Sequence, residues 1–159
     1  MKPAMSTPPF DHPAVGTTPT DDRARDVGRY ALGATLVFAG ASHLTFQRDD
    51  FQAQVPDWFP IKADAVVVAS GFVEITLGLA LLLLRRRRVP VGWVVAGFFV
   101  VIFPGNIAQW AEGNDAFGLD TGAKRFTRLF FQPLLVVWAL WSTGAWRAWR
   151  ASRAARTAA

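Results

Sequence analysis

The chain of 159 residues contains no cysteine. A disulfide, a thiolate nucleophile, an iron–sulfur cluster and a cysteine-ligated zinc site are therefore all excluded. Only two histidines are present. His43, the histidine in an apolar segment, has one distant intramembrane carboxylate, Glu74, and two such ligands do not make a metal site. We expect no bound metal, and any electron transfer would need a partner to supply the electrons.

Charged residues are almost missing from the long apolar segments. The composition is 52% hydrophobic, with seven Trp and thirteen Phe, while the 17 Lys and Arg and 12 Asp and Glu lie in the tails and between the apolar runs. A nucleic-acid-binding helix would interleave its basic residues with an apolar face, but here they cluster at segment ends. The net charge of +5 therefore indicates a lipid bilayer as the partner and no nucleic acid.

Four apolar runs are each about 20 residues long, which is enough to cross the hydrocarbon of a membrane. They cover 27–46, 63–84, 89–110 and 126–146. Helices of a soluble bundle would carry a polar face, but these runs are apolar nearly all round. The sequence predicts an all-α fold, an integral membrane four-helix bundle.

The flanking segments are polar. Residues 1–26 are rich in proline, threonine and aspartate, which predicts a disordered tail. Residues 27–146 form the predicted membrane domain, and 147–159 form a basic C-terminal tail.

Basic residues also predict the orientation of the bundle. Twelve of the seventeen fall on one side: Lys2, Arg23, Arg25, Arg29, Arg85, Arg86, Arg87, Arg88, Arg147, Arg150, Arg153 and Arg156. Cytoplasmic loops carry the excess of Lys and Arg in membrane proteins. Both termini are therefore predicted to be cytoplasmic.

Polar side chains inside the apolar runs are the candidate site residues, because hydrocarbon offers them no water. They are His43, Ser70, Glu74, Asn106 and Gln132. At 1.5 Å per residue, His43 lies about 5 Å below the outer boundary and Glu74 about 16 Å below it. All five belong to the outer half of the bilayer, which predicts a pocket open to the outer leaflet.

Small residues flank both ionisable groups at helical spacing. Two such stripes are present: Gly33, Gly40 and His43 in the first run, and Gly71, Glu74 and Gly78 in the second. Such stripes allow close helix approach, so both groups are predicted to face the bundle interior. Their depth difference of about 11 Å exceeds a hydrogen bond, which makes Ser70, one turn from Glu74, the better-placed bridge.

Glu74 is the candidate proton carrier, or an anchor for a lipid-soluble ligand; the alternative is a structural carboxylic acid bonded to a neighbouring helix. His43 is a weaker candidate, because a histidine near the interface is often structural. Asn106 and Gln132 border the same predicted pocket, but they are expected to hold helices together more than to carry chemistry. Pro104 and Pro133 each remove a backbone hydrogen bond beside these amides and free carbonyl groups for them.

Four stretches also resemble the DoxX-like family of small bacterial membrane proteins. They are Ala39-Gly40-Ala41-Ser42-His43-Leu44, Val55-Pro56-Asp57-Trp58-Phe59-Pro60 after Phe51, Ser70-Gly71-Phe72-Val73-Glu74-Ile75, and Phe103-Pro104-Gly105-Asn106-Ile107. One departure is Leu44, where that family commonly has an aromatic residue. The resemblance covers 27–146 and implies a compact four-helix bundle in the bacterial cytoplasmic membrane. Some members are described as subunits of a thiosulfate:quinone oxidoreductase or as membrane partners of soluble redox enzymes.

Three functions remain open at this point. The first is a redox-associated protein whose pocket accepts a quinone or a similar lipid-soluble molecule at His43, Ser70, Glu74, Asn106 and Gln132. The second is a non-catalytic membrane subunit or scaffold that docks a soluble partner on its arginine-rich face. The third is a small transporter or lipid-handling protein, although four helices are few for alternating access and no internal repeat is evident. Whether the protein is an enzyme stays open, and an accessory membrane subunit is favoured over an independent enzyme.

Overall fold

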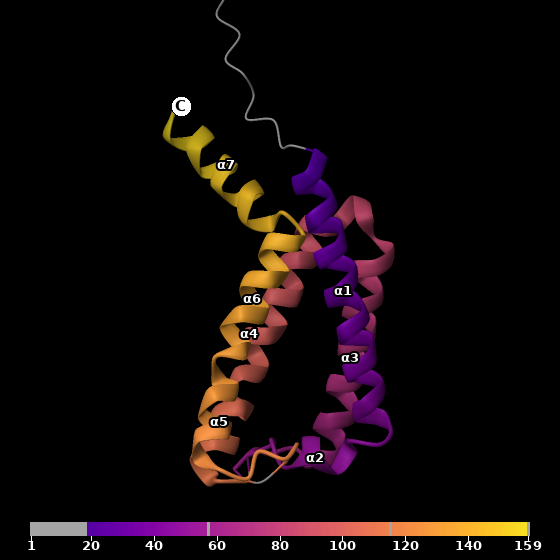
Figure 1. Cartoon of the computed structure of the whole chain (residues 1–159), viewed down its shortest axis with the longest axis vertical. Coiled ribbons are helices and arrows are strands. Elements are labelled where there is room, and N and C mark those ends of the chain that lie inside the picture. Colours follow the sequence, from indigo (N-terminus) through magenta and orange to yellow (C-terminus); the bar gives the residue numbers. More distant parts are fainter. Residues whose placement is uncertain (1–18, 57, 115, 159) are drawn as a thin grey trace, which may run out of the picture.

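The computed structural model describes residues 19–56, 58–114 and 116–158. Every regular element in this part of the chain is a helix. The long helices α1 (Pro19–Leu44) and α3 (Ala63–Leu83) are antiparallel neighbours, and α4 (Arg88–Glu112) packs chiefly on α6 (Phe131–Ser142) (Figure 1). Two helix pairs thus form the body of the protein, and they face each other across its middle.

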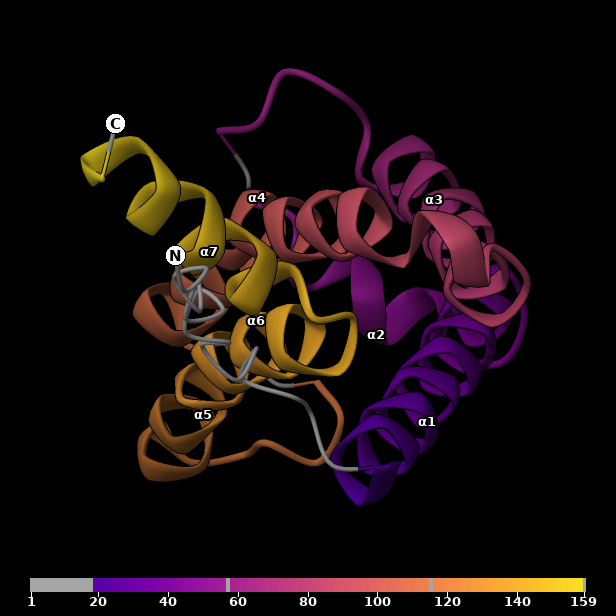
Figure 2. The same cartoon turned by 90° about the horizontal axis from the view of Figure 1, so that it is seen from above.

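Short elements connect the pairs at both ends. The helix α2 (Arg48–Gln52) and the segment leading to α5 (Gly122–Leu129) lie at one end. At the other end lie the start of α1, the 3₁₀ turn η1 (Arg85–Arg87) and α7 (Ala145–Thr157). The view along the bundle shows α1 beside α3, and α4 beside α6 (Figure 2). We call the end with α2 and the segment leading to α5 the α2 end. The opposite end, with η1, α7 and the start of α1, is the arginine end.

Two described helices, Ala63–Leu83 and Arg85–Glu112 with its initial 3₁₀ turn, are long and apolar enough to cross a membrane. A third candidate is the pair Gly122–Ser142 and Ala145–Thr157, which is bent by 68°. The run 27–46 is not among them, because Arg29 and His43 lower its mean hydropathy. Both of these side chains are buried, so the helix hides its polar groups against its neighbours.

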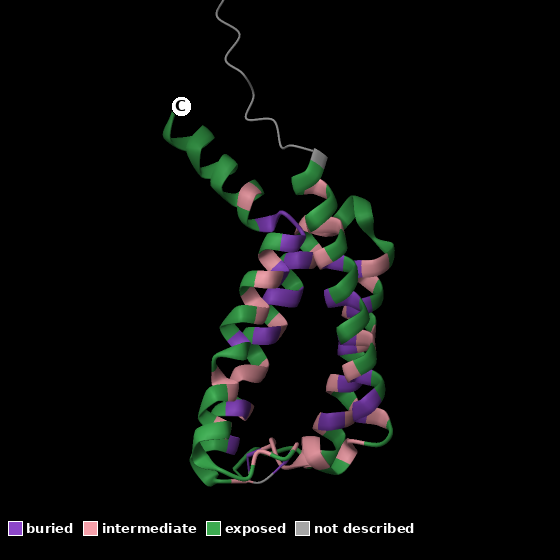
Figure 3. Cartoon of the chain, viewed as in Figure 1, coloured by how far each residue is buried: buried purple, intermediate pink, exposed green. Residues whose placement is uncertain are grey.

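The outward surface of the helices is apolar. Exposed side chains include Phe38, Phe72, Leu83, Val101 and Phe131, each more than half exposed. Buried residues face the interior of the bundle instead (Figure 3). Soluble proteins rarely expose so much contiguous apolar surface, so this distribution agrees with a helical protein in lipid.

The interface of α1 and α3 depends on four glycines that meet in pairs. A Cβ on Gly40 would lie 2.5 Å from the carbonyl oxygen of Gly71, and a Cβ on Gly78 would lie 2.6 Å from that of Gly33. Each pair therefore brings backbone against backbone, as small residues do in membrane helix packing. The stripes predicted from the glycine spacing do face each other.

The predicted disordered tail ends too late in the sequence, because 19–26 form the first two turns of α1. Residues 1–18 lie outside the described part of the chain. Asp21 and Asp22 fall in the first turn, where acidic groups stabilise the positive end of the helix dipole. Asp26 lies 3.2 Å from Arg85 and 3.8 Å from Arg88, and these contacts tie the extended helix to η1 and α4.

The fourth apolar run is not one helix. It divides at Phe130 into α5 and α6, and α6 ends before Gly144, whose φ of 74° belongs to the left-handed region. Pro133 explains the first division, because its ring displaces the carbonyl of residue 129 and it offers no N–H. Beyond Gly144 the basic tail continues as α7 rather than as coil.

Candidate functional site

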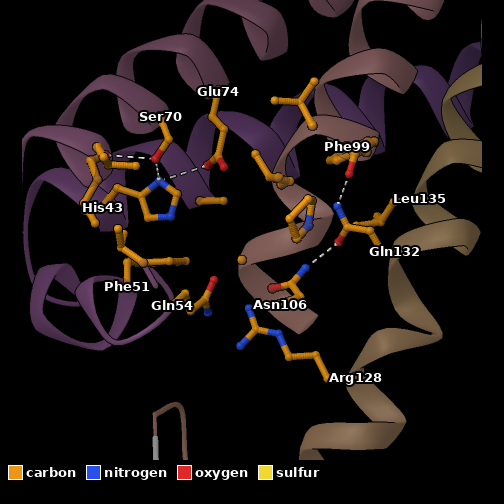
Figure 4. A pocket seen from close by; sticks show the side chains of 18 of the residues that line it. His43, Phe51, Gln54, Ser70, Glu74, Phe99, Asn106, Arg128, Gln132 and Leu135 are labelled. Atoms are coloured by element: carbon orange, nitrogen blue, oxygen red, sulfur yellow. Dashed lines mark hydrogen bonds and ion pairs between the residues drawn. The ribbon is translucent and has the colours of Figure 1, made fainter. Parts of the chain in front are cut away.

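A cavity of about 500 Å³ lies between the two helix pairs. Its polar lining includes His43, Gln54, Ser70, Glu74, Asn106, Arg128 and Gln132, contributed by α1, the segment after α2, α3, α4, α5 and α6 (Figure 4). Its apolar lining includes Leu32, Leu36, Val67, Phe99 and Leu135. All five polar residues that the sequence singled out therefore border one cavity.

The first polar group joins α1 to α3. His43 Nδ1 lies 3.2 Å from Glu74 Oε2 and 3.5 Å from the Ser70 hydroxyl. Both ionisable side chains are buried, at 4% and 6% exposure. The sequence made Ser70 the better-placed bridge to His43, and the structure places the imidazole close to both Ser70 and Glu74.

The register of the two helices explains how His43 and Glu74 meet. Gly33 opposes Gly78 and Gly40 opposes Gly71, which places Glu74 six residues, or about 9 Å, beyond the level of His43. Side chains on a helix lean toward its N-terminus. In an antiparallel pair the two side chains therefore lean toward each other, and this closes an offset that separates the backbones.

Glu74 Oε2 has an incomplete set of partners. Although the imidazole is at ion-pair distance, it makes no hydrogen bond to this buried oxygen, and neither does any other described residue. A buried carboxyl oxygen without a hydrogen bond costs free energy. The Glu74 residue borders the cavity, where its carboxyl group can accept a hydrogen bond from a ligand with a donor group.

Aromatic rings at the α2 end pack against the imidazole of His43. The Phe51 ring meets that of His43 edge to face, with 3.4 Å between ring centroids. Phe51 in turn packs on Phe117, at 4.7 Å. The short helix α2 therefore closes the cavity and fixes the orientation of His43.

The second polar group lies on the opposite wall. Asn106 Nδ2 donates to Gln132 Oε1 at 2.9 Å, and Gln132 Nε2 donates to the carbonyl of Phe99 at 2.5 Å. Pro104 deprives the neighbouring carbonyl of residue 100 of its helical partner and loosens α4 at this level. The two amides thus tie α6 to the loosened turn of α4, a structural role that their position in the sequence had suggested.

Arg128 is the site residue that sequence reasoning missed. It is one of the five basic residues outside the predicted cytoplasmic set, yet it borders the cavity. Its Nη1 donates to Gln109 Oε1 at 3.3 Å. When the amide oxygen of Gln54 faces it, that oxygen accepts from Nη1 and Nη2 at 2.8 and 2.7 Å. The only signal in the sequence was that Arg128 lies near the start of an apolar run, five residues before Pro133. This position does not predict which way the side chain points.

The arrangement combines donors and acceptors at its ends with an apolar interior. His43, Glu74 and Ser70 can exchange or share a proton with a ligand on one wall, and Arg128 can bind an oxygen atom on the other. No group of three or more His, Asp or Glu side chains suited to a metal ion occurs in the residues described by the structure. Concave sites of this volume, mostly apolar with a few polar groups, are typical of small-molecule binding.

Comparison with protein families gives one match, to a domain of unknown function, DUF8561, over residues 32–143. This stretch covers well over half of the chain. The chain belongs to the DUF8561 family. The matched stretch contains His43, Glu74, Asn106, Arg128 and Gln132, so the DUF8561 domain carries the cavity. Searches of curated proteins and of solved structures give no match.

Proposed function

We propose that this protein is a redox-associated membrane protein of the DoxX-like type, whose cavity binds a quinone or a similar lipid-soluble molecule. The observation that carries the proposal is the Glu74 carboxyl, buried beside His43 with one oxygen unsatisfied at the wall of an apolar cavity. In this function Glu74 exchanges a proton with the bound headgroup. The imidazole of His43 and the hydroxyl of Ser70 hold the headgroup in place.

The proposal includes four membrane-spanning segments, with α1 and the α5–α6 pair completing the set. It also places the arginine end in the cytoplasm, because that end carries most of the Lys and Arg. The α2 end, with the cavity nearest to it, then faces the outer leaflet of a bacterial cytoplasmic membrane. Since the chain has no cysteine, a soluble redox partner would supply or remove the electrons.

The decisive experiment compares lipid-soluble molecules that co-purify with three forms of the protein. Wild type, Glu74→Gln and the control Glu112→Gln, an exposed carboxyl at the end of α4, are purified in mild detergent and analysed by mass spectrometry. A quinone enriched with wild type and Glu112→Gln, but absent from folded Glu74→Gln, would support the proposal. The same lipid background in all three forms would contradict it.

A second candidate is a scaffold that docks a soluble partner, and the arginine end supports it. Arg85, Arg86 and Arg87 are exposed on η1, and α7 projects with exposed Arg150 and Trp146. The two functions differ in the effect of Glu74→Gln. A binding function loses ligand while the fold persists, whereas a scaffold loses stability in detergent and has no ligand to lose.

A further inference from the structure

Among the residues that the structure describes, Arg128 has no anionic partner. Its described contacts are the amide oxygens of Gln54 and Gln109 and the face of Phe117, whose ring centroid lies 4.7 Å from Cζ. Other cations at the α2 end pair with carboxylates at 2.7 Å, Arg48 with Asp64 and Lys124 with Asp120. Within 19–56, 58–114 and 116–158, no carboxylate lies at ion-pair distance from Arg128.

The hydrogen bonds of Arg128 leave one edge of its guanidinium available. The Gln54 oxygen bridges Nη1 and Nη2, and Gln109 takes a further bond from Nη1. A guanidinium has five N–H donors, and these contacts use three of them. The remaining edge, formed by Nε and Nη2, has the geometry that binds both oxygens of a carboxylate.

We propose that Arg128 forms an anion-binding subsite, and that the ligand class of the cavity is a lipid-soluble carboxylic acid with a single acyl chain. The inference rests on the broader part of the proposed function, namely that the cavity accepts a lipid-soluble molecule, and it names a carboxylic acid in place of a quinone as that molecule. Arg128 binds the carboxylate at the α2 end. The chain extends past Phe99 toward Leu32, Leu36 and Leu135, which line the apolar part of the cavity.

Charge matching favours a carboxylate over a phosphate. One negative charge neutralises the one guanidinium, and a partly desolvated charge pair of this kind is stronger than a pair in water. A phosphate monoester would bring a second negative charge into a cavity that already contains the Glu74 carboxyl. His43 is the other basic group on the wall, and it is engaged by Glu74 and Ser70.

The test measures displacement of a fluorescent medium-chain fatty acid from the full-length protein in detergent micelles. Competitors share one chain length and differ in the headgroup: carboxylic acid, methyl ester and alkyl phosphate, each corrected for partition into empty micelles. Wild type should bind the acid at least about tenfold more tightly than the ester, since a charge-assisted bidentate contact is lost in the ester. The phosphate should bind more weakly than the acid.

Variants assign the preference to Arg128. In Arg128→Gln the acid and the ester should bind equally, and Arg128→Lys should keep only part of the preference because it lacks the planar fork. Lys124→Gln removes a nearby exposed cation and should retain the full preference. The wild-type comparison of acid and ester needs no variant, so it remains informative even if Arg128→Gln fails to fold.

Each result decides between the two proposals. Equal binding of acid and ester by wild type, together with displacement of the probe by a short-chain quinone, would overturn the anion subsite and keep the quinone pocket. A strong preference for the acid, without any displacement of the probe by the quinone, would support the anion subsite and exclude a quinone as the ligand. Tighter binding of the phosphate than of the acid would overturn the carboxylate class.

Discussion

His43 Nδ1 and Glu74 Oε2 lie 3.2 Å apart, although their backbones are offset by about 9 Å along the antiparallel α1 and α3. The contact exists because each side chain leans toward its own N-terminus and hence toward the other. It positions the buried carboxyl at the cavity wall, and several measurable consequences follow from it and from its surroundings.

Replacement of His43 by leucine should destabilise the protein by about 2 kcal/mol, because the buried Glu74 oxygen then loses the imidazole nitrogen that lies 3.2 Å from it. The free energy of unfolding can be measured by denaturation in mixed micelles. In the double variant His43→Leu/Glu74→Leu the cost should be smaller than the sum of the single costs. Additive costs would mean that the two side chains do not interact.

Replacement of Gly40 by alanine should lower the free energy of unfolding by about 2 kcal/mol, because the new Cβ meets the Gly71 carbonyl at 2.5 Å and backbone must move. Gly97→Ala is the matched control, since a Cβ there has nothing within 4 Å. That control should be neutral or stabilising by up to about 1 kcal/mol through helix propensity. Equal effects of the two changes would exclude close packing of α1 on α3.

The amide pair on the other wall gives a third prediction. Gln132→Leu should cost about 1 to 3 kcal/mol, since it removes the bond to the Phe99 carbonyl and leaves Asn106 without its acceptor. A double-mutant cycle with Asn106→Leu should show coupling of about 1 kcal/mol. Independent effects of the two changes would speak against a direct hydrogen bond between them.

At the arginine end, Asp26 contacts Arg29, Arg85 and Arg88 at 3.5, 3.2 and 3.8 Å. Asp26→Asn should destabilise the protein by on the order of 1 kcal/mol, because partly exposed ion pairs contribute little each. The loss should shrink as salt is raised, since salt screens the wild-type pairs. Unfolding measured at low and high salt checks this, and a loss independent of salt would point to packing instead.

Gly144 determines where α6 gives way to α7. Its φ of 74° disfavours any other residue by about 1 to 2 kcal/mol, so Gly144→Ala should straighten the bend of 68° or destabilise the protein. Spin labels on α1 and α7 would report the change as a shift in distance distribution. Gly122→Ala, which has ordinary φ and open space around it, should leave both the distances and the stability unchanged.

Sequence reasoning succeeded where the local pattern carries the information. Continuous apolar runs with few charges specify helices suited to lipid, because an unpaired backbone group in hydrocarbon is costly. Glycines seven residues apart in α1 and in α3 indicated the faces that meet, and the five polar residues of the apolar runs all border one cavity. Each of these features depends on residue type and helical period alone.

Other features depend on contacts between segments far apart in the chain, and only the tertiary structure decided them. The register of α1 against α3 brings His43 to Glu74, whereas depth counted from expected boundaries kept them apart. The direction of Arg128 into the cavity is fixed by Gln54 and Gln109, which come from distant segments. The sequence determined which polar side chains of the apolar runs need partners inside the protein. Packing determined which partners they found, because side-chain direction and helix register are properties of the assembled bundle.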